Sequence, residues 1–238
     1  MNSPLVRKLS GFVELSRRDA LELEALSRPS QRLPARTRLV DEGERAQDIF
    51  LLLEGWACRL KILPNGSRQI LGYLIPGDIC DIHAYILEQM DHAIDLLSVG
   101  RVVRISPERM QAVLNDRPAV RRAFEWSTLV DIAVLRQWLI SASRRSAQAR
   151  MAHFFLEMWL RMRQVGLAED GQFAFPLTQV HLGDTLGLTP IHVNRTLQQM
   201  RAEGIVSFAR KRMTILNADR LAELAQFEPG YLHIQRDR

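Results

Sequence analysis

Side chains that could bind a metal or take part in catalysis are concentrated between positions 80 and 92. They are Cys80, Asp81, His83, Asp91 and His92, and such side chains are the usual protein ligands of zinc and iron. If residues 79–83 form a strand, alternation places Asp81 and His83 on one face and Cys80 on the other. Asp81, His83 and His92 then converge only if residues 91–95 return alongside, which makes these three the candidate effector pocket.

The charge of this segment argues against a bound phosphate. No Lys or Arg occurs between Arg68 and Arg101, whereas five acidic residues do. A phosphate group would meet negative charge here and no guanidinium fork to bind it. The sequence identifies no particular metal, and a further interpretation is that the pocket binds no effector at all.

The two cysteines, Cys58 and Cys80, are too few for a disulfide framework or a four-thiolate cluster. Both are flanked by apolar residues, so we expect them to be buried rather than redox-active. His83, His92 or Cys58 could also serve as an axial haem ligand, but no pattern selects one of them, and we expect no resident cofactor.

Short strands are predicted between Thr37 and Ile105, where apolar runs are separated by turn residues such as Asn65-Gly66. This spacing favours a β-sandwich or barrel. A helix is expected before it, at 16–27, capped by Ser16 with Asp19 in the capping box. The chain is 47% hydrophobic and 25% charged, as in globular proteins. It shows neither an apolar signal segment nor a membrane span, so we expect a cytoplasmic protein without a membrane partner.

A long helix is predicted at 118–143, where the sequence has no Gly and no internal Pro. Two stripes of mainly apolar residues follow helical spacing in it. Two stripes require two partners, so we expect one face to pack on its own domain and the other on a second copy. The alternative is a helix fully buried in a monomer. The stripes are Ala123, Trp126, Val130, Ala133, Gln137 and Ile140, and Phe124, Thr128, Ile132, Leu135, Leu139 and Ala142.

The residues from 177 to 216 predict a helix-turn-helix followed by a two-stranded wing. Thr178 can cap a first helix, and Gly187 suits the turn after it, where a positive φ is needed. Thr189 can cap a second helix, in which Pro190 occupies the favourable first position. In this arrangement the second helix enters the major groove of DNA. A further helix, at 146–164, has a Met-rich and aromatic face that we expect in the core.

The distribution of charge agrees with a nucleic-acid partner for the C-terminal half. Residues 1–110 contain 15 basic and 15 acidic residues, so the remaining 17 basic and 12 acidic residues carry the whole net charge of +5. A basic module on a neutral one is typical of a nucleic-acid reader joined to a sensing part. An ordinary basic surface is the alternative.

The chain resembles the Crp/Fnr family of bacterial transcription regulators. The resemblance rests on the order of a β-rich domain with PGD (76–78), one long helix, and the segment LGDTLGLTPIHVNRTLQQMRAEGIV (182–206). It implies an α+β protein: a double-stranded β-helix (jelly-roll) sensor domain at 1–117, a dimerisation helix at 118–143 and a winged helix-turn-helix at 144–238. It also implies a homodimer on a palindromic DNA operator, contact with RNA polymerase, and no enzymatic activity.

Family positions can be carried over to the second helix of the motif. Arg195 matches a base-reading arginine, whose fork can take both acceptors of guanine, although a solvated charge or phosphate contact is the alternative. Many members have a glutamate where this chain has Ile191. Pro190 and Ile191 could instead contact a thymine methyl, and His192 could donate to a base or phosphate. Contacts to the DNA backbone are expected from Thr178, Gln179, Thr189, Asn194, Arg210, Lys211 and Arg212.

The residues with which family members bind their usual effectors are mostly absent from this sequence. Members that bind cyclic AMP have a Gly-Glu pair followed by Arg-Ser or Arg-Thr, whereas this chain has Gly77-Asp78 and no such arginine. Members with an iron-sulfur cluster carry N-terminal cysteines, and the first 57 residues here have none. An alternative function is a metal-dependent cupin-type enzyme or metal sensor with an appended DNA-binding domain, which would use Asp81, His83 and His92.

Overall fold

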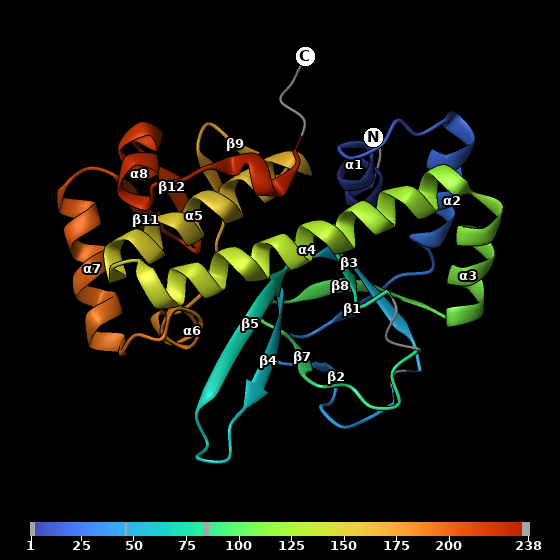
Figure 1. Ribbon diagram of the computed structural model, residues 1–238, viewed down its shortest axis with the longest axis horizontal. Coiled ribbons are helices and arrows are strands. Elements are labelled where there is room, and N and C mark those ends of the chain that lie inside the picture. Colours follow the sequence, from blue (N-terminus) through green and yellow to red (C-terminus); the bar gives the residue numbers. More distant parts are fainter. Residues whose placement is uncertain (1–2, 46, 83–85, 235–238) are drawn as a thin grey trace. The chain divides into compact units, whose positions relative to one another are not determined.

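The computed structural model describes residues 3–45, 47–82 and 86–234. The chain divides into two compact units, Met1–Leu129 and Val130–Ile234. The division falls within one unbroken helix, α4 (Pro118–Arg144), which confirms the predicted long helix (Figure 1). His83 lies outside the described residues.

Two four-stranded antiparallel sheets form the centre of the first unit. Their strand orders are β1-β8-β3-β6 and β2-β7-β4-β5. Apolar side chains from both sheets, including Phe50, Ala57 and Ile94, form a common core, which confirms a β-sandwich. The strands are β1 (Gln31–Leu33), β2 (Arg38–Val40), β3 (Ile49–Glu54), β4 (Ala57–Ile62), β5 (Arg68–Leu74), β6 (Ile79–Cys80), β7 (Ala93–Leu96) and β8 (Gly100–Ile105).

Three helices contribute to a second core of this unit: α1 (Pro4–Ser10), α2 (Arg17–Leu26) and α3 (Pro107–Asp116). Their buried residues cluster with Leu51 and Val103 of the first sheet. Ser16 and Asp19 form the expected capping box of α2. Helices α1 and α3 were not predicted, although Ser3 and Ser106 cap them and each has Pro in its first turn.

The prediction of a strand at 79–83 is wrong for the residues after Cys80. Strand β6 ends there, and Asp81 has a φ of +49°, in the left-handed region that extended strands do not enter. The alternation argument for Asp81 and His83 therefore does not apply. Cys58 and Cys80 are both buried, as expected, and burial raises the pKa of Cys58 to about 12.

The apolar stripes of α4 are distributed differently from the prediction. Phe124, counted in the second stripe, is buried with the core of the first unit, whereas Ile140, counted in the first stripe, is exposed. The 3.6-residue turn rotates each stripe slowly around so long a helix, which explains the exchange. The exposed apolar side chains of α4 are Leu129, Ile132, Leu135, Leu139 and Ile140.

The second unit contains helix α5 (Ala147–Gln164), capped by Ser146, and a small antiparallel sheet of order β11-β12-β10-β9. Phe155 of α5 packs edge-on against Phe175 and Phe208, so α5 and the sheet share an aromatic core. Strands β9 and β10 were not predicted. The remaining elements are β9 (Ala168–Glu169), β10 (Gln172–Ala174), α6 (Gln179–Leu186), α7 (Pro190–Ala202), β11 (Val206–Ala209), β12 (Arg212–Ile215), α8 (Ala218–Ala225) and η2 (Pro229–Leu232).

Candidate nucleic-acid interface

Helix α6 is bounded by the residues that its sequence predicts. The hydroxyl of Thr178 accepts a hydrogen bond from the backbone N–H of His181 at 3.2 Å, and the Thr178 N–H donates to His181 Nδ1 at 3.3 Å. At the other end, Gly187 has a φ of +65° and closes the helix in the left-handed conformation. Both ends of the helix are therefore set by local chemistry.

The turn after α6 passes very close to the helix at Gly183. A Cβ at this position would lie 2.7 Å from the carbonyl oxygen of Leu188, which is closer than real Cβ contacts. The Leu188 N–H donates to the Gly183 carbonyl at 3.2 Å, so the two backbones are tied here. This close approach fixes the turn between the two helices of the motif.

Helix α7 has one buried and one exposed face. Thr189 caps it by accepting from the His192 N–H at 3.3 Å, and Pro190 occupies the first turn. Val193, Leu197 and Met200, which follow helical spacing, are buried on one face. The opposite face presents Ile191, Asn194, Arg195 and Gln198 to solvent.

Most residues predicted to contact DNA lie at the surface of this unit. Pro190, Ile191 and Arg195 are exposed, whereas His192 is half-buried at the edge of the same face. Thr178 and Thr189 are exposed although their oxygens accept capping hydrogen bonds, and each hydroxyl hydrogen can still donate to a phosphate. The other predicted backbone contacts, also exposed, are Gln179, Asn194, Arg210, Lys211 and Arg212.

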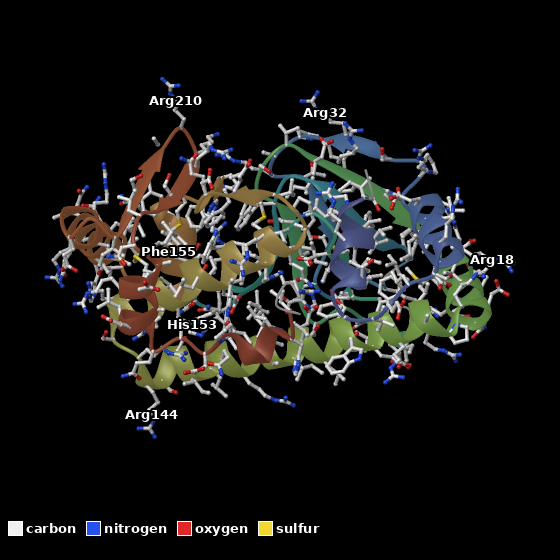
Figure 2. All side chains as sticks on the ribbon, turned by 90° about the horizontal axis from the view of Figure 1, so that it is seen from above. Arg18, Arg32, Arg144, His153, Phe155 and Arg210 are labelled. Atoms are coloured by element: carbon white, nitrogen blue, oxygen red, sulfur yellow. The ribbon has the colours of Figure 1, made fainter. Side chains whose placement is uncertain are left out.

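The predicted wing is the hairpin of β11 and β12, in which Ala209 pairs with Arg212. Its two-residue turn is Arg210-Lys211, with φ angles of +49° and +60°. Both angles are positive, as in the hairpin turns that normally use Asn-Gly, so two cationic residues occupy a backbone that L-residues avoid. Figure 2 shows Arg210 extending from the tip of this hairpin.

The second unit also contains a buried polar cluster, which the sequence analysis did not predict. Glu157 of α5 is fully buried and accepts hydrogen bonds from Trp138 Nε1 at 3.2 Å and from the Tyr231 hydroxyl at 3.0 Å. His153, labelled in Figure 2, stacks on the Tyr231 ring. The cluster joins α4, α5 and the C-terminal η2, and the periodicity of any one segment gives no sign of it.

Ionisation in this cluster is set by burial. Burial raises the pKa of Glu157 to about 7, despite the opposing charge of Arg161 and the two hydrogen bonds. Burial, with the neighbouring charge of Arg145, lowers the pKa of His153 to about 3. The site therefore holds a carboxyl group that titrates near neutrality beside an imidazole that stays neutral.

The candidate effector pocket of the first unit is partly assembled. Asp81 and His92 do meet, with 3.0 Å between Oδ2 and Nε2, and His92 Nδ1 lies 2.7 Å from Asp91. Arg59 of β4 also reaches Asp81, at 3.2 Å, and sequence reasoning missed it because it comes from a distant strand. His83 falls outside the described residues.

The charges in this pocket are paired with one another. Burial opposes ionisation of Asp81, but the charge of Arg59 and the hydrogen bond with His92 lower its pKa to about 2. Burial likewise disfavours the imidazolium of His92, yet the two aspartates raise its pKa. Among the described residues, no group of three or more His, Cys, Asp or Glu could hold a metal ion.

The nearby PGD turn (76–78) is in contact with the N-terminal helix α1. Asp78 is buried, and its carboxylate accepts from Lys8 Nζ at 2.8 Å and from the Ile75 N–H at 2.8 Å. A Cβ at Gly77, whose φ is +95°, would lie 2.7 Å from the carbonyl oxygen of Pro4. The turn therefore serves as a docking point for α1.

Two family models match the chain. The model of the cyclic nucleotide-binding domain matches residues 30–117, and that of the Crp-like helix-turn-helix domain matches residues 149–224. Within the described residues, no helix is long and apolar enough to cross a membrane.

Curated proteins and solved structures resemble the chain over most of its length. It is 24% identical to the nitrogen fixation regulation protein FixK of Bradyrhizobium diazoefficiens, over 87% of each chain. It is 24% identical to the transcriptional activator protein anr of Pseudomonas aeruginosa, over 94% of this chain and 89% of that protein. The structure of FixK2 from Bradyrhizobium japonicum is similar with a TM-score of 0.72 and 25% identity, covering 82% of this chain and 96% of that one. A CRP-family transcriptional regulator from Thermus thermophilus has the same fold, with a TM-score of 0.66 and 19% identity over 83% and 97% of the two chains.

Proposed function

The chain belongs to the Crp/Fnr family of DNA-binding transcription regulators, not to a family of enzymes, and we propose that it binds a palindromic operator as a homodimer. Helix α7 of each subunit would enter a major groove, with the two grooves about one helical turn apart. The observation that carries this proposal is the solvent-facing side of α7, where Arg195 stands exposed with Ile191 and Asn194.

Arg195 is proposed to read a guanine, with Pro190, Ile191 and His192 as the other base-reading residues. A guanidinium can donate to both O6 and N7 of guanine, and such a pair contributes about 1–3 kcal/mol of discrimination. Thr178, Gln179, Thr189 and Asn194, together with Arg210, Lys211 and Arg212 of the wing, are proposed to hold the DNA backbone.

The test of base reading compares Arg195→Ala with Arg201→Ala, which removes another exposed arginine from the last turn of the same helix. The operator is first selected from random DNA and then titrated with each G·C pair replaced in turn. We expect Arg195→Ala to lose discrimination at one G·C pair, and Arg201→Ala to keep it. An equal loss of affinity for all sequences in Arg195→Ala would contradict base reading by this residue.

The homodimer is proposed to form through the exposed apolar side chains of α4. Ile132, Leu135 and Leu139 recur at helical spacing on one side of α4, and Leu139 is 71% exposed. A second copy packed along this stripe would bury it, as in other helix pairs with apolar seams. The proposed dimer then supplies the two α7 helices that a palindrome requires.

Sedimentation equilibrium tests the dimer. Leu139→Asp places a charge in the proposed seam without disturbing a buried site, so we expect monomers at concentrations where the unaltered protein is a dimer. Arg122→Asp, at an exposed position of the same helix more than two turns before Ile132, is the control and should remain dimeric. A dimeric Leu139→Asp protein would place the subunit contact elsewhere.

Transcription is proposed to change through contact between the bound dimer and RNA polymerase, in the cytoplasm where the chromosome lies. We further propose that cyclic nucleotides do not control the protein in the usual way, since Arg59 is already paired with Asp81. Isothermal titration with cyclic AMP tests this point, and binding at micromolar concentration would contradict it.

A further inference from the structure

Ile191 of α7 is a large apolar side chain that is almost fully exposed to solvent. It is 83% exposed, the largest value among the exposed large hydrophobic residues of the described chain. Single exposed apolar residues are ordinary on protein surfaces, so exposure alone identifies nothing. The position of Ile191 is more informative, because it lies in the first turn of α7 on the face that the proposed function turns toward DNA.

The surroundings of Ile191 define what it can recognise. The first turn of α7 contains no acidic residue, so no side-chain carboxylate is present there to accept from a base amine. Arg195 lies one helical turn further along on the same exposed face. A residue with two heavy branches at Cβ has one strongly preferred side-chain rotamer in a helix, so Ile191 presents a nearly fixed apolar surface.

The major groove offers one apolar group per A·T pair and none on an unmodified G·C pair. That group is the C5-methyl of thymine. An aliphatic side chain pressed against the amine of cytosine or adenine would displace water and leave the amine without a partner, which disfavours those bases. Isoleucine therefore matches thymine by contact and disfavours cytosine and adenine by desolvation.

We propose that Ile191 is a specificity-determining residue that contacts a thymine methyl close to the guanine read by Arg195. Four residues of helix rise about 6 Å, and base pairs are stacked about 3.4 Å apart, so the thymine lies within two base pairs of that guanine. This inference rests on the proposed function, because it requires α7 to lie in the major groove.

Replacing the selected thymine by deoxyuridine tests the contact, since it removes the methyl group and keeps the hydrogen-bonding pattern. Burying one such carbon contributes enough to change affinity about fourfold for one half-site, and about 15-fold when both half-sites are altered. We expect this decrease for the unaltered protein in a fluorescence anisotropy titration. Ile191→Ala should bind the thymine and deoxyuridine operators alike, within about twofold.

Leu216→Ala is the matched control, because Leu216 is another exposed aliphatic residue of the same unit and lies outside α7. It should keep the full preference for thymine over deoxyuridine. Ile191→Glu provides a second variant, which should also lose that preference, and circular dichroism should show both variants folded because position 191 contributes little to the core.

The outcomes separate this inference from the proposed function. If the protein selects an operator but binds its thymine and deoxyuridine forms equally, or selects no thymine within two base pairs of the guanine, the inference is overturned and DNA reading stands. If no sequence is preferred over bulk DNA, the proposed function itself fails. Weakened dimerisation of Ile191→Ala without DNA would show that Ile191 contacts another subunit, which also overturns the inference.

Discussion

Glu157→Gln should change the pH dependence of stability in the unit that carries the helix-turn-helix. The folded protein raises the pKa of Glu157 to about 7 from 4.5 because its carboxyl is fully buried. Between these two pH values the folded state keeps a proton that the unfolded state releases. The contribution of Glu157 to the free energy of unfolding is therefore fully present below pH 4.5 and is lost as pH rises through 7.

The size of the effect follows from the shift. Each pKa unit corresponds to about 1.4 kcal/mol, so a shift from 4.5 to about 7 gives a loss of roughly 3 kcal/mol across the window. His153 acts in the opposite direction, because its pKa is lowered to about 3 by burial and by Arg145. Its contribution is present above its unfolded pKa and is lost as pH falls, so the two effects partly cancel in the unaltered protein.

A difference measurement isolates Glu157 from His153 and from its other charged neighbours, Arg145, Arg161 and Asp131. Urea unfolding is followed from pH 5 to pH 8 for the unaltered protein and for Glu157→Gln, which keeps an acceptor for Trp138. Between pH 5 and pH 8 the stability of the variant relative to the unaltered protein should rise by roughly 2–3 kcal/mol, because part of the full effect falls below pH 5. Glu203→Gln, which removes an exposed carboxylate from the same unit, is the control. A relative stability of Glu157→Gln that is equal at pH 5 and pH 8 would refute the reasoning.

Three further predictions concern the same architecture. Gly183→Ala should lower the stability of the helix-turn-helix by about 1–3 kcal/mol in thermal unfolding, because its Cβ would meet the Leu188 carbonyl, whereas Gly230→Ala, with open space around it, should not. Replacing Arg210-Lys211 by Asn-Gly should stabilise the wing by about 1 kcal/mol, because the turn needs positive φ, and should weaken DNA binding. The dependence of log affinity on log salt should fall by about one for each phosphate that the wing no longer neutralises, and an unchanged slope would exclude the wing from DNA. Cys58, with its pKa raised to about 12 by burial, should react with iodoacetamide only after unfolding, so labelling located at Cys58 by peptide mass spectrometry in native protein at pH 8 would contradict its burial.

The parts of this protein that could be predicted from sequence are those determined by neighbouring residues. Ser16 and Asp19, Thr178, Gly187 and Thr189 all act as expected, because caps and tight turns depend on side chains within three or four positions. The apolar period of α4 likewise revealed a long helix with two apolar faces. Its buried and exposed residues were only partly assigned, because small departures from an ideal period accumulate over such a length.

The features that were missed join segments far apart in the chain. Arg59 reaches Asp81 from another strand, and Glu157 collects hydrogen bonds from residues 138 and 231. The expected strand at 79–83 fails because Asp81 adopts a left-handed backbone, where its carboxylate meets Arg59 and His92. No local pattern contains that information.

Because Arg59 is paired with Asp81, the carboxylate of Asp81 competes with any external anion for the Arg59 guanidinium. Asp81 is supplied by the same chain, so its effective concentration near the guanidinium is on the order of millimolar or above. An incoming anion that uses Arg59 has to displace this tethered carboxylate, and its apparent affinity falls accordingly. Protonation of Asp81 offers little help, because its pKa of about 2 keeps it charged at any physiological pH. A small anion can therefore bind at Arg59 only if it also makes favourable contacts with other residues of the first unit.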